Sequence, residues 1–287
     1  RCQYLRPTLL LALAGARGPL LGVHGEELIA SMDPSGPLAD AAQMCRHLKV
    51  PPGSTFYQCA EAYVTGHHKN VRDNRGPAQL HILRVIGRFD STETILHRRV
   101  LEIGCGALDL ARVLVPKLPP DSYVCVEPNN WLNVATLQHD LGFLREVLEK
   151  RALFLRREDF DASAALRLAP GPGGGLFDAV FSHSVLSHAA RPQLRAWLRA
   201  VEAVLAPGGV AVASLYHHDP KTGSYDVGDS PHTEWTYPLI TILSRETVGA
   251  EAMAAGLSFE PEWSESLRNF YGNRVGERHD WAVFRKT

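Results

Sequence analysis

The sequence lacks the features that mark membrane-spanning and nucleic-acid-binding proteins. None of its apolar stretches approaches the run of about 20 residues that a membrane span needs. Lysine and arginine together number 30 against 31 acids, which gives a net charge of -1, and no block of basic residues is present. The composition therefore disfavours both a membrane span and nucleic acid as a partner.

Cysteine is also sparse, with five in 287 residues and no pair in a Cys-x-x-Cys arrangement. Cys105 and Cys125 fall inside apolar runs that are typical of core strands. We therefore expect reduced thiols and an intracellular protein, cytoplasmic in the first instance.

Residues 1–25 contain three arginines, an apolar patch at 9–13 and no acid. This composition suits the remnant of a targeting segment, which would place the protein in an organelle, but it favours a short helix docked on the domain or disordered in part. The chain begins at Arg1, so we expect a processed or truncated form whose true start is not visible.

Proline and glycine punctuate residues 33–53, and a polar, helical stretch follows to about residue 90. We expect residues 1–90 to form an N-terminal extension and helical cap, and residues 91–287 to form one α/β domain. A flexible glycine-rich turn at 171–175 interrupts that domain.

Short apolar runs alternate with helical periodicity from residue 98 onward, as in β-α repeats. This predicts a doubly wound, seven-stranded, mostly parallel sheet with helices on both faces. No helix separates the last two strands, so the last strand is expected to be antiparallel. An amphipathic helix over 194–205 is predicted to stop at Pro207-Gly208-Gly209. The expected strands are 99–103, 122–126, 152–155, 177–182, 209–215, 257–263 and 279–285.

The first strand ends in an acid and a glycine turn that favour a nucleoside pocket. Gly104 and Gly106 let a ligand lie against the main chain. Asp109 stands where a dinucleotide-binding motif has its third glycine, and Glu102 would repel a pyrophosphate. Glu127, at the end of the second strand, is placed to accept hydrogen bonds from both ribose hydroxyls. A nucleoside with a cationic tail, S-adenosylmethionine, fits this pattern.

Residues from about 98 to 215 resemble a class I S-adenosylmethionine-dependent methyltransferase. The matched segments are the glycine turn at 100–106, the ribose acid, an Asp-Phe pair after the third strand, the fourth strand with its sequel at 177–188, and the turn at 205–209. The resemblance implies a Rossmann-like fold, S-adenosylmethionine as cofactor and methyl transfer as activity. It implies cofactor contacts by Glu102, Gly104, Cys105, Gly106, Glu127, Pro128, Asn129, Asp159, Phe160, Ser182 and His183.

Methyl transfer from a sulfonium is an in-line displacement, so the protein must align the acceptor and, where necessary, remove a proton. His183 and His188 follow the fourth strand at the expected ligand edge and are the candidate bases, although each also suits a structural role. The long polar and aromatic segment 216–243 is expected to shape the acceptor pocket. Its candidate contacts are Tyr216, His217, His218, Trp235 and Tyr237.

The acceptor is expected to be a small molecule, methylated on oxygen, with nitrogen or sulfur open. The histidine spacings do not predict a metal site, and the protein is expected to be a monomer or homodimer. Two alternatives stay open: a non-catalytic protein of the same fold that binds or regulates, and a nucleotide-dependent oxidoreductase, which the missing third glycine disfavours.

Overall fold

The computed structural model describes residues 75–86, 97–128, 133, 136–137, 140–168, 175–219, 221–236, 239–260 and 279–286. Residues 1–74 lie outside these ranges, so the proposed division of the chain near residue 90 stays a prediction.

The domain is built on one seven-stranded sheet in the order β3-β2-β1-β4-β5-β7-β6. Strands β1 to β5 pair in parallel, whereas β7 pairs antiparallel with both β5 and β6. This confirms the predicted fold class, including the antiparallel last strand. The strands are β1 Val100–Ile103, β2 Tyr123–Val126, β3 Leu153–Leu155, β4 Phe177–Ser182, β5 Leu205–Leu215, β6 Leu257–Phe259 and β7 Asp280–Lys286.

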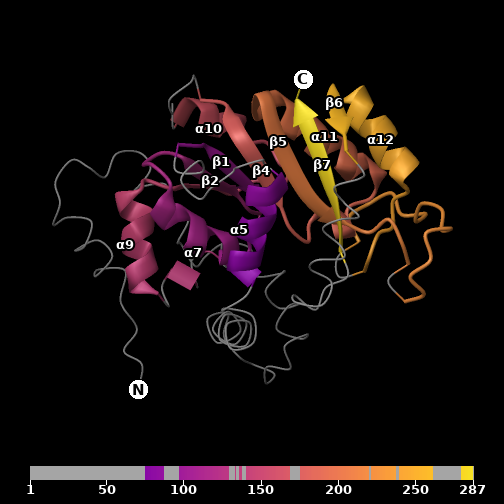
Figure 1. The fold of residues 1–287 in the computed structure, drawn as a ribbon, viewed down its shortest axis with the longest axis horizontal. Helices are drawn as coiled ribbons and strands as arrows, with labels where there is room; N and C mark the ends of the chain where they lie inside the picture. Colours follow the sequence, from indigo (N-terminus) through magenta and orange to yellow (C-terminus); the bar gives the residue numbers. More distant parts are fainter. Residues whose placement is uncertain are drawn as a thin grey trace, which may run out of the picture.

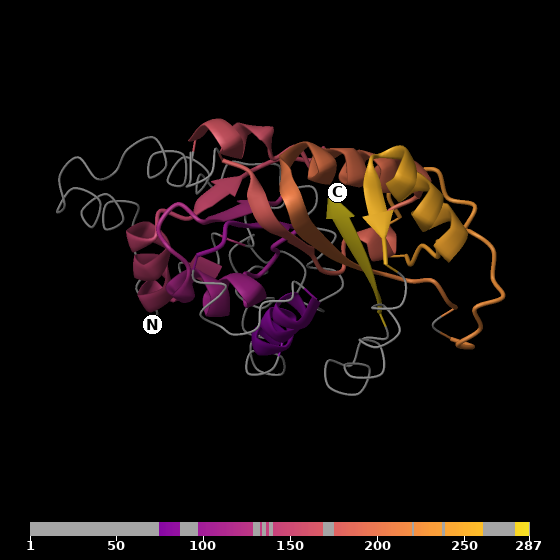
Figure 2. The same cartoon turned by 45° about the horizontal axis from the view of Figure 1, so that its top comes forward.

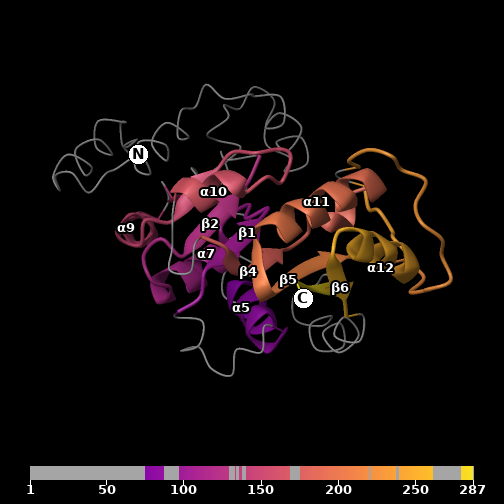
Figure 3. The same ribbon diagram turned by 90° about the horizontal axis from the view of Figure 1, so that it is seen from above.

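Helices cover both faces of the sheet, each over its own apolar cluster (Figures 1 and 2). Helices α5, α7 and α9 pack on one face, and α10, α11 and α12 on the other. Figure 3 shows α11 and α12 side by side near β5 and β6, where the two helices contact each other. Their bounds are α5 Arg75–Ile86, α7 Asp109–Leu114, α9 Leu141–Glu149, α10 Ser163–Leu168, α11 Arg191–Val204 and α12 Arg245–Ala254, with short 3-10 helices η2 Val115–Lys117 and η3 Leu186–His188.

The fifth strand begins earlier than predicted. Helix α11 ends at Val204, and β5 starts at once with Leu205, which pairs with Phe177. The next pair joins Ala179 to Val210, so β4 advances two residues while β5 advances five. The predicted Pro-Gly-Gly turn at 207–209 is therefore a bulge inside the strand, where Gly208 has a φ of +73°.

The sixth strand is shorter than predicted. β6 ends at Phe259, and Glu260 is not in the strand. Residues 261–263, which completed the expected strand, lie outside the described residues.

An ion pair joins α11 to α12. Glu251 accepts hydrogen bonds from the Nε atom of Arg191 at 2.5 Å and from Arg195 at 2.6 and 2.7 Å. The Glu251 side chain is 6% exposed, while both arginine side chains are nearly half exposed. The Arg195 hydrogen bonds, supported by Arg191, lower the pKa of Glu251 from 4.5 to about 2.

We expect Glu251→Gln to lower the free energy of unfolding by about 1 kcal/mol near neutral pH, because it weakens charge-assisted hydrogen bonds whose arginines are partly solvated. A lowered acid pKa stabilises the fold above pH 4.5 and loses that effect as the pH falls toward about 2. Denaturant unfolding across that range measures the difference. Glu246→Gln, an exposed acid on the same helix, is the control, and equal losses in both variants would contradict the expectation.

Candidate active site

The turn after β1 depends on two glycines in left-handed backbone conformations. Gly104 has a φ of +79° and Gly106 a φ of +47°. A Cβ added at Gly104 would lie 2.2 Å from Cγ2 of Val185, so the segment after β4 packs directly on the turn. A Cβ added at Gly106 would meet no described atom within 4 Å. The turn is therefore packed closely at Gly104, and none of the described residues beyond its chain neighbours fills the space beside Gly106.

Glu127 and the turn meet at the carboxyl edge of the sheet, as the sequence predicts. The backbone N–H of Gly106 donates to Oε2 of Glu127 at 2.9 Å, and the N–H of Gly104 donates to the Val126 carbonyl at 2.8 Å. Glu127 is 5% exposed, and Pro128 beside it is half-buried. The predicted contact Asn129 lies outside the described residues.

Glu102 is a buried acid beneath the turn rather than a group on its surface. Its Oε2 accepts a hydrogen bond from the Tyr123 hydroxyl, and the residue is 3% exposed. The pKa of Glu102 is raised from 4.5 to about 8, mainly by burial and also by the nearby carboxylates of Asp109 and Glu127, against the lowering effect of the Tyr123 hydrogen bond. Three acids, Glu102, Asp109 and Glu127, thus lie close together around the turn.

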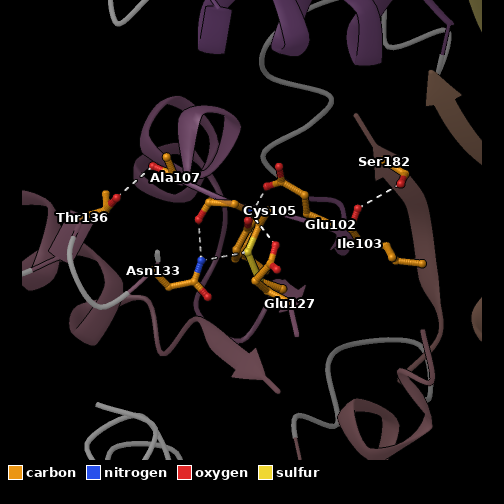
Figure 4. The surroundings of a disulfide bond; sticks show 11 residues. Glu102, Ile103, Cys105, Ala107, Glu127, Asn133, Thr136 and Ser182 are labelled. Atoms are coloured by element: carbon orange, nitrogen blue, oxygen red, sulfur yellow. Dashed lines mark hydrogen bonds between the residues drawn. A yellow bond between two sulfur atoms is a disulfide. The ribbon is translucent and has the colours of Figure 1, made fainter. Parts of the chain in front are cut away.

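A disulfide bond joins the turn to β2 (Figure 4). Cys105, between the two glycines, is bonded to Cys125, with their Cα atoms 6.0 Å apart. The expectation that these cysteines are reduced thiols is therefore wrong for this pair. The reason is spatial, since the left-handed glycines curl the turn back over β2 and bring together residues that are 20 positions apart.

The side chain of Asn133 holds the turn from outside the sheet. Its Nδ2 donates to the Gly106 carbonyl at 2.7 Å and contacts Sγ of Cys105 at 3.3 Å. Thr136 adds a hydrogen bond from its hydroxyl to the Ala107 carbonyl at 3.2 Å. Neither residue was predicted from the sequence, because an isolated polar side chain in a helical stretch gives no signal of this kind.

Asp159 and Phe160 follow β3 at the same edge. Asp159 accepts two hydrogen bonds from Arg157, at 3.0 and 2.7 Å, and one from the Asp161 backbone, and its pKa is lowered mainly by the Arg157 contact. Asp161, not Asp159, accepts from the backbone of Ser163 at the start of α10. Phe160 has a φ of +62° and packs against the core cluster on the α10 face.

The end of β4 is tied to the neighbouring strands. The Ser182 hydroxyl donates to the Ile103 carbonyl at 2.9 Å, and the Ser184 N–H donates to Oγ of Ser214 at 2.7 Å. His183 is half-buried and stacks on Trp281, with ring centroids 5.5 Å apart. This candidate base is thus part of an aromatic cluster between β4 and β7.

His188, in η3, contacts the loop that follows β5. Its Nδ1 lies 2.8 Å from the Leu239 carbonyl, and the His188 carbonyl accepts hydrogen bonds from the N–H and hydroxyl of Thr236 at 2.9 and 3.0 Å. The ring of Trp235, which is 46% exposed, lies 6.2 Å from the His188 ring. The structure therefore places His188, a predicted base, beside Trp235, a predicted acceptor contact.

Histidines 217 and 218 are buried where β5 ends. Oδ2 of Asp280 accepts from the His217 backbone N–H at 2.9 Å and lies 2.7 Å from Nδ1 of His218. Nδ1 of His217 lies 2.7 Å from the Leu243 carbonyl, and burial lowers the pKa of His217. Tyr216 is 8% exposed and stacks edge-on against His279 at 4.7 Å. The predicted contact Tyr237 lies outside the described residues.

Residues His279, Asp280 and Trp281 belong to this region, although the sequence indicated only a strand there. They reach it because β7 runs antiparallel to β5, which pairs Asp280 with Leu215 and Trp281 with Ser214. In the sequence, the only sign of this role is that the polar pair His279 and Asp280 begins an otherwise apolar run.

Comparison with known proteins identifies the family. Residues 101–211 match the family model described as a methyltransferase domain. This part of the chain is therefore a methyltransferase domain, as the resemblance to class I S-adenosylmethionine-dependent methyltransferases predicts. Similar solved structures include DesVI of Streptomyces venezuelae, with 16% identity, a TM-score of 0.51 and coverage of 79% of this chain and 98% of that one.

Two further structures resemble this methyltransferase. An S-adenosylmethionine-dependent methyltransferase of Clostridium acetobutylicum has 10% identity and a TM-score of 0.50, over 79% of this chain and 99% of that one. The sugar N-methyltransferase KedS8 of Streptoalloteichus has 18% identity and a TM-score of 0.48, over 78% and 93%. No curated protein matches the sequence significantly.

The turn suits S-adenosylmethionine, the predicted cofactor. The open space beside Gly106 admits a ligand close to the main chain, and a neighbouring cation would compensate the buried acids. Among the described residues, His, Cys, Asp and Glu form no group of three that could hold a metal ion. No helix in that part of the chain is long and apolar enough to cross a bilayer.

We expect Glu102→Gln to stabilise the cofactor-free protein at alkaline pH. Between pH 4.5 and about 8 the folded state keeps a proton that the unfolded chain has released, so wild-type stability falls with rising pH, by up to about 1.4 kcal/mol per pH unit. An uncharged glutamine removes this dependence. Thermal or denaturant unfolding should therefore show a gain above pH 8 that shrinks toward pH 5, and parallel pH profiles for the two proteins would contradict it.

Proposed function

We propose that the protein transfers a methyl group from S-adenosylmethionine to an oxygen atom of a small-molecule acceptor. The observation that carries this proposal is the meeting of the Gly106 N–H and the Glu127 carboxylate beside open space at the carboxyl edge of the sheet. The sulfonium supplies an already activated methyl group, so the chain's own task is to bind, orient and deprotonate.

The cofactor would be held by groups from three strand ends. Glu127 is proposed to accept the two ribose hydroxyls, Gly104 and Gly106 to admit the ligand close to the backbone, and the acids around the turn to favour its positive charge. Asp159 and Phe160 are proposed to contact the base, since β3 pairs with β2 and both strands end at this edge. Pro128, Asn129, Cys105, Ser182 and His183 complete the proposed set.

His188 is the preferred candidate for the base. A carbonyl oxygen only accepts hydrogen bonds, so the contact with Leu239 places the proton of the neutral ring on Nδ1 and leaves the lone pair on Nε2. His183 is the second candidate, although its ring stacks on Trp281 and meets His279 edge-on. The tautomer of His188 is the one that a proton acceptor needs.

The acceptor would lie against the loop after β5. Tyr216, Trp235 and Tyr237 are proposed to contact it directly. His217 and His218 are 2% and 0% exposed, so we propose that they act by holding the start of the loop to Asp280 and Leu243.

Cofactor binding tests the assignment of Glu127. Glu127→Gln should weaken binding of S-adenosylmethionine by about 10- to 100-fold, because hydrogen bonds to a charged group contribute about 1.5–3 kcal/mol each. Calorimetric titration measures the dissociation constant. Glu246→Gln, which makes the same chemical change on the exposed surface of α12, should bind as wild type. Absence of binding to the wild-type protein would favour the alternative of a non-catalytic protein.

The pH profile of methyl transfer tests the base. With the best acceptor from a panel of small alcohols, amines and thiols, His188→Gln should lower kcat by about 10²- to 10⁴-fold and abolish the fall in rate at acid pH. His232→Gln, an exposed histidine in the same loop, is the control. An unchanged pH profile in His188→Gln and in His183→Gln would contradict a histidine base and favour a sulfur acceptor.

A further inference from the structure

The Cys105–Cys125 disulfide joins the two segments that carry the proposed cofactor site. Cys105 lies in the turn between Gly104 and Gly106, and Cys125 lies two residues before Glu127. Cys105 is 4% exposed and Cys125 is not exposed at all, so the bond runs beneath the turn. It fixes the distance between the turn and β2.

The two ends of this bond differ in their freedom to move. Cys125 sits inside the sheet, where it pairs with Glu102 of β1 on one side and with Phe154 of β3 on the other. Cys105 belongs to no strand, and its glycine neighbours permit backbone rotation. Two thiols need more room between their sulfur atoms than a covalent bond leaves. Reduction must therefore displace the turn rather than the strand.

A displacement of the turn would move the hydrogen-bond donor of Glu127, the proposed ribose-binding acid. The Gly106 N–H that donates to Oε2 of Glu127 is next to Cys105, and the Asn133 amide contacts both the Gly106 carbonyl and the Cys105 sulfur. The disulfide form thus holds the turn, the acid and the Asn133 side chain in one hydrogen-bonded arrangement (Figure 4). Binding to a pre-organised site costs less ordering than binding to a mobile one.

We propose that Cys105 and Cys125 form a reversible oxidation site, and that the disulfide form binds S-adenosylmethionine more tightly than the dithiol form. This inference rests on the cofactor site proposed above. The oxidant is a low-molecular-weight disulfide of the glutathione type. One cysteine thiolate attacks it and releases one small thiol, and the second thiolate then attacks the mixed disulfide and releases the other, so that two protein thiols are oxidised and one disulfide is reduced to two thiols.

Linkage makes the effect reciprocal. If oxidation tightens cofactor binding by some factor, the cofactor must shift the thiol–disulfide equilibrium toward the disulfide by the same factor. A disulfide that only stabilised the fold would change the free energy of unfolding. It would change neither the affinity for the cofactor nor the effect of the cofactor on the thiol–disulfide equilibrium.

The first experiment measures affinity in both redox states. Cys2, Cys45 and Cys59 are replaced by serine so that only the pair remains, and free thiols are counted by alkylation and mass spectrometry. Titration with S-adenosylhomocysteine should give a dissociation constant at least about fivefold larger for the dithiol form. Cys105→Ala and Cys125→Ala, each without a partner for disulfide formation, should bind equally under oxidising and reducing conditions.

The second experiment measures the linkage. The same protein is equilibrated in mixtures of oxidised and reduced glutathione with and without S-adenosylhomocysteine, and the thiols are counted after trapping. With the ligand present, the thiol–disulfide equilibrium of the pair should shift toward the disulfide. The shift should equal the ratio of the two dissociation constants measured in the first experiment.

Equal affinities in the two redox states, or an unmoved midpoint, would overturn the proposal while leaving the cofactor site standing. A redox response that persists in both alanine variants would also overturn it. Binding in neither state would contradict the proposed cofactor site and this inference together.

Discussion

The close approach of Val185 to Gly104 is the contact on which the rest of the site depends. A side chain at Gly104 would collide with Val185, and the backbone there is in a left-handed conformation that favours glycine, so both packing and conformation require glycine at this position. That conformation curls the chain back over β2. It thereby places Cys105 over Cys125 and aims the Gly106 N–H at Glu127. The turn is thus held on one side by the segment after β4 and on the other by β2.

The electrostatics of the turn follow from the same geometry. Folding the turn against the sheet buries Glu102 beside Tyr123 and brings Asp109 and Glu127 near enough to affect its pKa. A buried carboxyl without a cation favours its neutral form. A ligand that brings positive charge reverses this balance, whereas a pyrophosphate would add repulsion. The acids around the turn are thus consistent with the proposed cationic cofactor.

The sequence predicted those parts of the structure that are local or periodic. Seven apolar runs and one amphipathic helix were enough for the sheet and its antiparallel last strand, and Glu127 was placed correctly beside the turn. The start of β5 was missed because a Pro-Gly-Gly stretch predicts a stop, while the strand absorbs it as a bulge. The disulfide was missed because it depends on the curl of the turn, which spacing does not reveal.

The acceptor side depends on the antiparallel insertion of β7. Because β7 runs against β5, Asp280 lies at the end of β5 and binds the His217 backbone and the His218 ring. The far part of the loop is fixed separately, where the Leu239 carbonyl meets His188. The residues between these anchors include Trp235, which is half exposed. The proposed acceptor surface is thus held by contacts to β7 and η3, whereas the glycine turn is held by contacts to β2 and to Val185.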